Sequence, residues 1–234
     1  MFFYATVRTR VSRGASESGT VQQLPRGRHR LSREQVLASQ RGRMLAAMAE
    51  TVAEKGYVRT TVADVIERAG VSRETFYEHF SSKEDCFLAA YDTGVEALHE
   101  VMGAALAGSR AGPEKRLDRV LKAYFDALAA EPAFARTFLI EVYAVGPRAL
   151  ERRVELQQRF VETIAEIFGV EDAVHGSSER FACEALVAAI TSLVTSRVGA
   201  GRLDTLDELR PPLVGLARRM VPGPSARRVR RARL

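Results

Sequence analysis

The sequence predicts an all-α protein with an N-terminal three-helix helix-turn-helix domain and a C-terminal helical bundle. Apolar residues recur at helical spacing along most of the 234 residues, and no segment alternates with the two-residue period of a strand. Two short helical segments meet at Gly70, and proline stands at three expected helix starts, where its missing N–H is tolerated. We divide the chain into a disordered basic arm (1–31), the helix-turn-helix domain (32–80), the bundle (81–221) and a disordered basic tail (222–234).

The positive charge lies at the two ends of the chain. The formal net charge is +6, yet residues 1–33 carry +6 and residues 218–234 carry +7, which leaves −7 in the residues between them. This distribution favours polyanion-binding ends. The start of the chain, rich in arginine and serine, also resembles an organelle transit peptide, and a dispensable start is a further interpretation.

One part of the basic arm has a pattern suited to DNA. An extended segment with arginines around a glycine fits a narrow, electronegative minor groove. These candidate contacts are Arg26, Gly27, Arg28, His29 and Arg30. The alternative is a solvated tail that contacts phosphates without selectivity.

The first helix is expected from Arg33 to Lys55. Ser32 and Gln35 form a capping box before it, and Gly56 ends it. Its apolar face is expected to comprise Val36, Met44, Leu45, Met48 and Val52.

Two short helices follow. Thr61 with Asp64 predicts a capping box for a helix that ends at Gly70, where a left-handed residue is wanted. Ser72 caps a second helix that extends to about Phe80. In that helix Phe76 and Phe80 point inward, whereas Arg73 and Tyr77 point outward. Such a pair of helices is a helix-turn-helix.

The segment from Gly70 to Glu84, GVSRETFYEHFSSKE, resembles the signature of TetR-family transcriptional regulators. The resemblance covers about a third of the chain, from about Ser32 to about Ala105. It implies a homodimeric, sequence-specific DNA-binding protein of the bacterial cytoplasm, associated with the nucleoid. It also implies a repressor that leaves a palindromic double-stranded operator when a small, largely apolar effector binds to the bundle.

The second helix is expected to read the operator. Ser72, Arg73 and Thr75 occupy its first turn, and Arg73 on guanine would contribute roughly 1–3 kcal/mol of discrimination. Further DNA contacts come from positions that resemble the family's phosphate-binding residues and from a helix start that favours anions: Tyr77, His79, Lys83, Thr60 and Thr61. Glu74 and Glu78 either face cytosine amino groups or point outward and pair with Arg73 or Lys83.

Six helices are expected in the rest of the chain: 82–106, 113–130, 132–145, 147–168, 181–198 and 212–221. The resemblance places an effector cavity among the middle helices, and aromatic residues at helical spacing make candidates for its lining, although plain core is the alternative. These candidates are Phe87, Tyr91, Phe125, Phe134, Phe138, Tyr143 and Gln158.

The segment from Ala185 to Ser196 contains no charged residue, so it must be covered on several sides. It is either a central core helix or a helix packed against its copy in a second subunit. By resemblance, the last two helices form the dimer interface, through Leu186, Ile190, Leu193, Val194, Leu213, Leu216 and Met220.

Other functional classes are disfavoured. No nucleophile–base constellation, phosphate-binding loop or metal-ligand spacing is present, so we expect no enzyme, cofactor or metal site. No apolar run approaches the roughly 20 residues of a membrane span. The remaining alternative is a structural protein that coats DNA without an effector or a specific operator.

Overall fold

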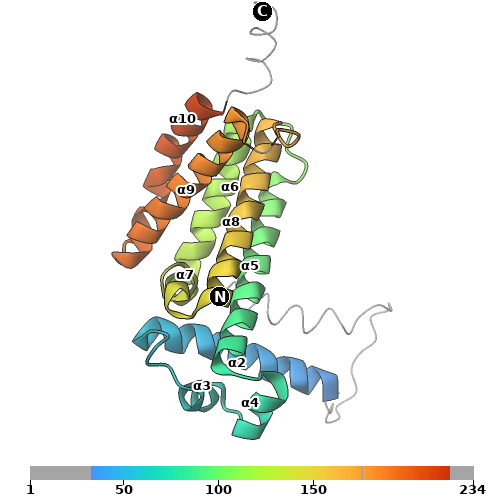
Figure 1. Cartoon of the computed structure of the whole chain (residues 1–234), viewed down its shortest axis with the longest axis vertical. Helices are drawn as coiled ribbons and strands as arrows, with labels where there is room; N and C mark the ends of the chain where they lie inside the picture. Colours follow the sequence, from blue (N-terminus) through green and yellow to red (C-terminus); the bar gives the residue numbers. More distant parts are fainter. Residues whose placement is uncertain (1–32, 175, 222–234) are drawn as a thin grey trace, which may run out of the picture.

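The computed structural model describes residues 33–174 and 176–221, and every regular element within them is helical. Figure 1 shows the arrangement. The elements are α2 (Arg33–Lys55), α3 (Val62–Ala69), α4 (Arg73–His79), α5 (Lys83–Leu106), α6 (Pro113–Ala130), α7 (Pro132–Leu139), η1 (Glu141–Ala144), α8 (Pro147–Phe168), α9 (Ser178–Gly199), η2 (Leu203–Leu209) and α10 (Arg210–Met220). The predicted all-α class is confirmed.

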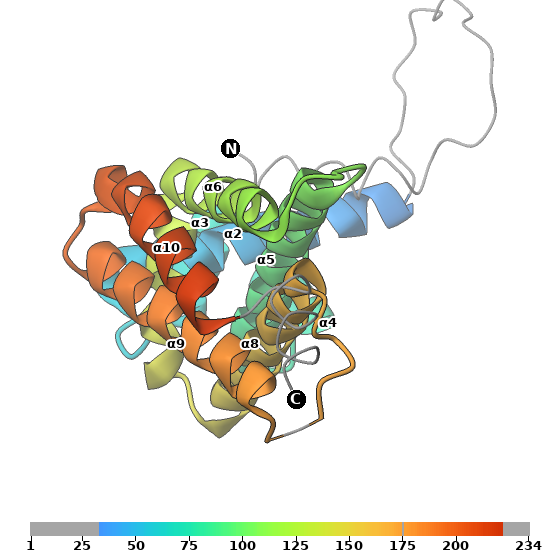
Figure 2. The same cartoon turned by 90° about the horizontal axis from the view of Figure 1, so that it is seen from above.

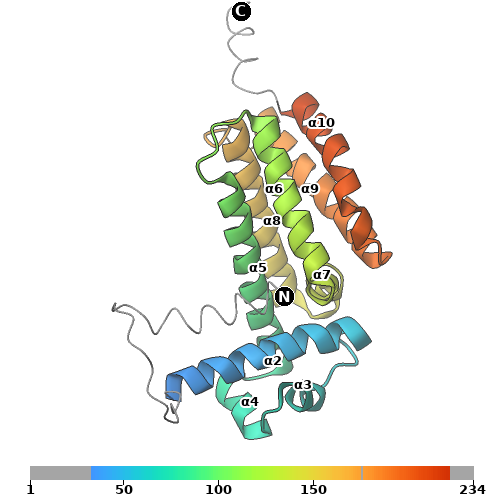
Figure 3. The same ribbon diagram turned by 180° about the vertical axis from the view of Figure 1, so that it is seen from behind.

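The three helices α2–α4 form one end of the molecule. α2 lies across the foot of the bundle, with α3 and α4 on its far side (Figures 1 and 3). Their apolar faces meet the first half of α5 in one core cluster, which includes Met44, Met48, Phe76, Phe80 and Phe87. The short helices are therefore held by α2 and α5, because a seven-residue helix buries too little surface to be stable alone.

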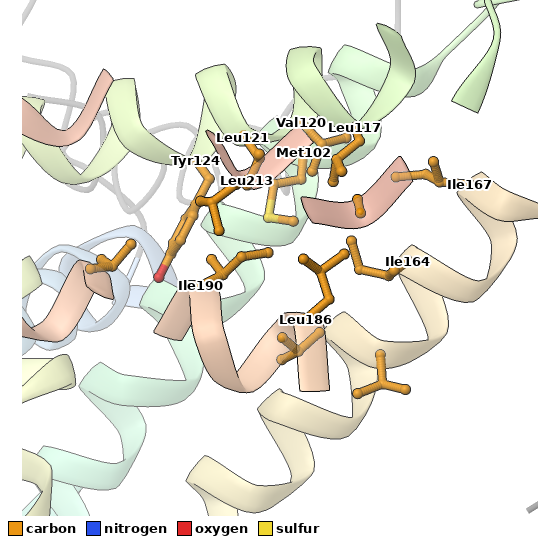
Figure 4. Packing of buried hydrophobic residues seen from close by; sticks show 14 of the residues in the cluster. Met102, Leu117, Val120, Leu121, Tyr124, Ile164, Ile167, Leu186, Ile190 and Leu213 are labelled. Carbon is orange, nitrogen blue, oxygen red and sulfur yellow. The ribbon is translucent and has the colours of Figure 1, made fainter. Parts of the chain in front are cut away.

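The bundle contains a second core cluster. α5 packs along α6, α8 along α9, and α10 against α6 and α9. Figure 2 shows α9 and α10 side by side on one flank. Between the helices, aliphatic side chains such as Met102, Leu117, Ile164, Leu186 and Leu213 interdigitate (Figure 4).

Three predicted helices differ from those observed. α9 begins at Ser178, earlier than the predicted 181, and the other two differ beside a long-range contact. The segment 132–145 breaks after Leu139 into α7 and the 3₁₀ turn η1, where the Glu141 carboxylate accepts a hydrogen bond from the Tyr57 backbone N–H at 3.0 Å. The last helix begins at Arg210, whose guanidinium bonds to Asp118 at 2.9–3.0 Å and to Asp207 at 2.6 Å. In both cases a long-range polar contact accompanies the changed boundary.

One expected core residue lies outside the core. Val36 is exposed because the N-terminal part of α2 extends beyond the bundle (Figures 1 and 3). Among the described helices, α9 alone is long and apolar enough to cross a membrane, by length and composition only. In this fold α9 packs against α8 and α10.

Candidate DNA-binding surface and ligand cavity

The corner between α3 and α4 is built by local hydrogen bonds. The Thr61 hydroxyl accepts from the Asp64 N–H at 3.2 Å, and the Asp64 carboxylate accepts from the Thr61 N–H at 2.7 Å. Gly70 has a φ of +62°, and Ser72 Oγ accepts from the Thr75 N–H at 3.1 Å. The predicted caps and the left-handed glycine are confirmed, so the orientation of α4 follows from local chemistry.

The two faces of α4 differ in the way the sequence predicts. Phe76 and Phe80 are buried, whereas Arg73 and Tyr77 are exposed on the opposite face. Arg73 Nη2 donates to the Tyr77 hydroxyl at 3.4 Å, and its guanidinium carbon lies 5.4 Å from the Tyr77 ring centroid. The two side chains therefore form one outward-facing pair that carries a planar cationic donor group.

Ion pairs and ring contacts attach this corner to α2. Arg68 of α3 pairs with Glu54, and Lys55 pairs with Asp64 at 2.8 Å. The hydrogen bonds from Lys55 and from Thr61 lower the pKa of Asp64 to about 2. Arg41 lies 4.8 Å over the Phe80 ring and links α2 to the end of α4. Exposed ion pairs contribute little stability individually, so their main effect here is to fix orientation.

Lys83 is bonded within its own chain. Its ammonium group donates to the backbone carbonyls of Tyr57 at 3.0 Å and Thr60 at 2.9 Å, and it lies 4.0 Å from the Tyr57 ring centroid. Burial also lowers the pKa of Lys83. We therefore expect Lys83 to link the start of α5 to the α2–α3 loop in place of the predicted phosphate contact.

Two more predicted phosphate contacts, Thr60 and His79, differ in burial. Thr60 is buried and donates its hydroxyl to the Gly56 carbonyl at 2.9 Å. Burial lowers the pKa of His79, and His79 Nε2 is enclosed without a partner among the described residues. The contact predicted for Thr60 is therefore wrong, whereas His79 is only half-buried and its contact stays a prediction. Thr61 stays exposed, although its hydroxyl is already bonded to Asp64 at 2.8 Å.

The carboxylates of α4 remain in solvent. Glu74 and Glu78 are exposed, and no ion pair joins either to Arg73 or Lys83 within the described part of the chain. The two carboxylates therefore point outward as expected but without the expected ion pairs, and the cytosine interpretation stays a prediction. The arm residues Arg26, Gly27, Arg28, His29 and Arg30 lie outside the described residues.

Tyr57 connects the helix-turn-helix to the bundle, a role that sequence reasoning missed. Its N–H donates to Glu141 of η1, its carbonyl accepts from Lys83, and its ring lies 5.3 Å from that of Phe87. Nearby, Thr137 of α7 donates to the Ala49 carbonyl of α2 at 2.8 Å. The only sequence signal at Tyr57 was an aromatic residue directly after the glycine that ends α2.

Phe134 packs closely on α5. A Cβ on Gly94 would lie 1.7 Å from the Phe134 ring, so only glycine permits this approach. Phe134 also contacts Phe138, with ring centroids 4.5 Å apart. α7 is therefore seated on both α5 and α2.

The predicted effector residues do not line one cavity. Phe87, Tyr91 and Phe138 pack against one another as filled core, with ring centroids 5.4–5.6 Å apart. Phe125 is buried in the other cluster. Tyr143 is 56% exposed, and Gln158 is exposed and donates to Glu162 at 3.0 Å. The plain-core alternative therefore describes Phe87, Tyr91 and Phe138, and Gln158 is a surface residue.

A different, apolar cavity lies between α5, α6, α8 and α9. Its free volume for water-sized molecules is about 30 Å³, and Figure 4 shows several of its side chains. The lining residues are Met102, Val120, Leu121, Tyr124, Phe160, Thr163, Ile164, Val187, Ile190 and Thr191. With this volume the cavity holds little more than one or two waters, so a larger ligand requires the helices to separate.

Most residues predicted at the dimer interface face the interior of their own chain. Leu186, Ile190, Val194 and Leu213 are buried within the bundle, so their assignment to the interface is wrong. The outward face of α9 instead carries Phe181, 67% exposed, and Leu193, 43% exposed. Leu216 and Met220 of α10 are partly buried. On a helix with so many apolar residues, the sequence alone does not show which side faces the core.

Comparison with known proteins identifies the N-terminal part. The sequence profile of the family described as "Bacterial regulatory proteins, tetR family" matches residues 44–90. The chain is 24% identical to the HTH-type transcriptional activator FasR of Mycolicibacterium smegmatis over 164 residues, which cover 70% of this chain and 74% of FasR. It is 28% identical to the HTH-type transcriptional regulator EthR of the same species over 128 residues, covering 55% of this chain and 58% of EthR.

A solved structure has the same fold. The FadR transcriptional regulator of Bacillus subtilis, determined in complex with stearoyl-CoA, aligns with a TM-score of 0.65 and 21% identity. The alignment covers 75% of this chain and 96% of that protein. Among the residues that the structure describes here, no three His, Cys, Asp or Glu side chains gather in a group that could hold a metal ion.

Proposed function

Because this chain is a DNA-binding transcriptional regulator of the TetR family and not an enzyme, we propose that it binds a palindromic operator as a homodimer. A small, largely apolar ligand releases it, so it acts as a repressor wherever its operator overlaps a promoter. The observation that carries this proposal is the exposed Arg73–Tyr77 pair on a firmly capped α4.

The surface of α4 supports base reading. The guanidinium of Arg73 presents two parallel donors, which match O6 and N7 of guanine. Ser72 and Thr75 belong to the same first turn, the part of a recognition helix that reaches base edges. With Lys83 bonded to the α2–α3 loop and Thr60 buried, Arg73 and Tyr77 carry the main contacts of this surface.

The exposed apolar face of α9 supports the dimer. Phe181 and Leu193 are large apolar side chains in solvent, and the small residues Ala188, Ser192 and Ser196 lie exposed along the same helix. Small residues allow close approach of a second helix, and covering Phe181 and Leu193 is favoured by about 25 cal/mol per Å² of apolar surface. Two copies joined here present two recognition helices, which a palindrome requires.

The cavity supports control by a ligand. Because its free volume is only about 30 Å³, a ligand of many carbon atoms binds a more open arrangement of α5, α6, α8 and α9 than the one described. α5 lines the cavity through Met102 and begins at Lys83, which holds the α2–α3 loop. A shift of α5 therefore changes the position of α4, and the ligand lowers DNA affinity by the ratio of its affinities for the two states.

Binding-site selection with the purified full chain tests the DNA part of this proposal. We expect an inverted repeat, and fluorescence anisotropy should show affinity at least about 10³-fold higher for it than for a scrambled duplex at 150 mM salt. Similar affinity for both duplexes would support the DNA-coating alternative and refute specific readout.

Titration of stearoyl-CoA into the protein–operator complex tests the ligand part. This probe is chosen because the FadR regulator of Bacillus subtilis was solved with it. We expect release of DNA by the wild type and weaker release by Ile164→Trp, which fills the cavity. The matched control is Leu150→Trp, an exposed position on the same helix. If stearoyl-CoA and fatty acids of the same length all leave the complex intact, the apolar-effector proposal fails.

A further inference from the structure

Two glycines lie inside α5, and they differ in what stands beside them. Glycine destabilises a helix interior relative to alanine. A Cβ added at Gly103 would have no neighbour within 4 Å among the described residues, whereas a Cβ added at Gly94 would lie 1.7 Å from the Phe134 ring. The glycine at position 94 is therefore required by packing, because the Phe134 ring of α7 lies directly against the backbone of α5.

The Phe134 ring has little free space beside it. The cavity that it lines together with Gly94 and Leu128 has a free volume of about 20 Å³ for water-sized molecules. Such a volume takes about one water, which is far smaller than a phenyl ring. The ring therefore has no room to turn away from α5 on its own, and displacing it displaces α7.

The segment formed by α7 and η1 also holds α2. Thr137, which is fully buried, donates to the Ala49 carbonyl of α2 at 2.8 Å. Glu141 of η1 accepts from the Tyr57 N–H at 3.0 Å, and a Cβ on Gly56 would lie 3.3 Å from that carboxylate. Figures 1 and 3 show α7 between the bundle and α2. The contact of Phe134 on α5 is therefore linked to α2 through this segment.

α2 in turn carries the other two helices of the helix-turn-helix domain. Lys55 pairs with Asp64 of α3 at 2.8 Å, and the guanidinium carbon of Arg41 lies 4.8 Å from the Phe80 ring centroid at the end of α4. A displacement of α2 relative to the bundle therefore moves α3 and α4 with it. Hydrogen bonds to base edges tolerate only a few tenths of an ångström, so such a displacement weakens base reading.

We propose that Phe134 is a positioning residue for DNA binding. Its ring, packed on Gly94, sets the separation between α7 and α5 and thereby the position of α2 and α4 on the bundle. Phe134 packs against both core clusters, the one around the helix-turn-helix and the one inside the bundle. This inference goes beyond the proposed function, from which it takes only the selected operator as a probe.

Gly94→Ala tests the contact directly. Its methyl group forces the ring to retreat by about 2 Å to reach an ordinary carbon–carbon separation of about 3.5 Å. Operator affinity, measured by fluorescence anisotropy, should fall by about 10-fold or more, as for the loss of one base contact. Gly103→Ala is the matched control, because it makes the same change on the same helix where the methyl meets nothing. It should keep the affinity of the wild type and raise the Tm.

A double variant separates positioning from lost packing. Phe134→Ala alone should lower operator affinity by a few-fold, because α7 loses its seat on α5. Adding Gly94→Ala to it should change the affinity by less than about twofold, because the ring that the methyl would meet is gone. Phe168→Ala removes a buried ring at the far end of α8, so it should lower the Tm without changing operator affinity.

Spin-label distances test the inference without DNA. Glu74→Cys on α4 and Lys122→Cys on α6 place labels at exposed positions, while the native cysteines are buried. Pulsed EPR on labelled chain diluted with unlabelled chain measures the distance within one protomer. That distance should shift by about 2 Å in Gly94→Ala, which is the retreat of the ring, and stay unchanged in Gly103→Ala. Where Gly94→Ala does not fold, Phe134→Leu should broaden the distance distribution.

The outcomes decide between positioning and ordinary packing. Unchanged operator affinity and unchanged label distances in a folded Gly94→Ala protein would overturn the inference. An equal effect of Gly94→Ala with and without the Phe134 ring would also overturn it. If the wild type selects no operator, the proposed function fails, and the label distances alone then decide whether Phe134 positions α4.

Discussion

The helices α4 and α9 each have an exposed face, and the two faces differ in chemical character. α4 has seven residues, a capped start and one fully buried anchor, Phe76, and its outer face carries Arg73 and Tyr77. α9 has 22 residues and buries Leu186, Val194 and other side chains, yet it leaves Phe181 in solvent. A polar exposed face on a firmly held short helix suits DNA, whereas an apolar exposed face suits a second protein surface.

The contrast also concerns what holds each helix in place. α4 depends on a few local contacts, so a single substitution can release it. α9 shares its burial among many side chains, so its outer face can be changed without unfolding the bundle. Substitutions on the two helices and at the contacts around them test this difference, and the largest effect is expected at the anchor of α4.

Phe76→Ala should lower the free energy of unfolding by about 3–5 kcal/mol, because it empties the anchor of α4 inside the core. Urea denaturation followed by circular dichroism measures the change. The adjacent Tyr77→Ala, on the exposed face, should cost less than about 1 kcal/mol. Equal losses would show that α4 is not anchored on one side.

Leu193→Arg should convert the dimer to a monomer and lower operator affinity by about 100-fold or more, because two linked half-site contacts become one. Sedimentation velocity and anisotropy measure the two effects. Leu150→Arg places the same charge at an exposed leucine of α8 and should change neither. If the Leu193→Arg protein stays dimeric, the dimer interface lies on another surface of the chain.

Arg73→Ala should lower affinity for the selected operator by about 1–3 kcal/mol while leaving affinity for scrambled DNA nearly unchanged. Anisotropy with both duplexes separates the two effects. A uniform loss for every sequence would assign Arg73 to phosphate instead of bases.

Lys83→Met should lower the free energy of unfolding by about 1–2 kcal/mol, since it removes two charged hydrogen bonds to backbone carbonyls. The slope of log Kd against log salt should stay the same, because Lys83 releases no DNA counterion. A decrease of that slope by about one would show that Lys83 contacts a DNA phosphate.

The capping box of α3 should make a small, pH-dependent contribution to the free energy of unfolding. The pKa of Asp64 is about 2 in the folded chain, below its ordinary value of 3.8. Its contribution is therefore present above about pH 4 and is lost as the pH falls toward 2. Asp64→Asn should flatten the stability profile over that interval, as measured by urea denaturation at each pH. An unchanged profile would mean that Asp64 has the same pKa in the folded and the unfolded chain.

Sequence reasoning recovered the parts of the fold that depend on neighbouring residues. Thr61, Gly70 and Ser72 each act within four residues of their own position, and their caps form as predicted. The bounds of α2, α6 and α8 follow from lysine–glycine, proline and glycine positions in the same way. The candidate site was predicted less well, because Lys83 has partners 23 and 26 residues away that no local pattern specifies.

By itself, then, the sequence determined an all-helical chain with a capped helix-turn-helix and an outward Arg73–Tyr77 pair, because caps and periodicity act over one or two turns. Only the tertiary structure decided that Lys83 bonds to the α2–α3 loop, that Leu186 and Val194 face inward, and that Phe181 stays exposed. Those facts depend on which helices become neighbours across many residues, and a charge or an apolar side chain looks the same in the sequence whichever neighbour it meets.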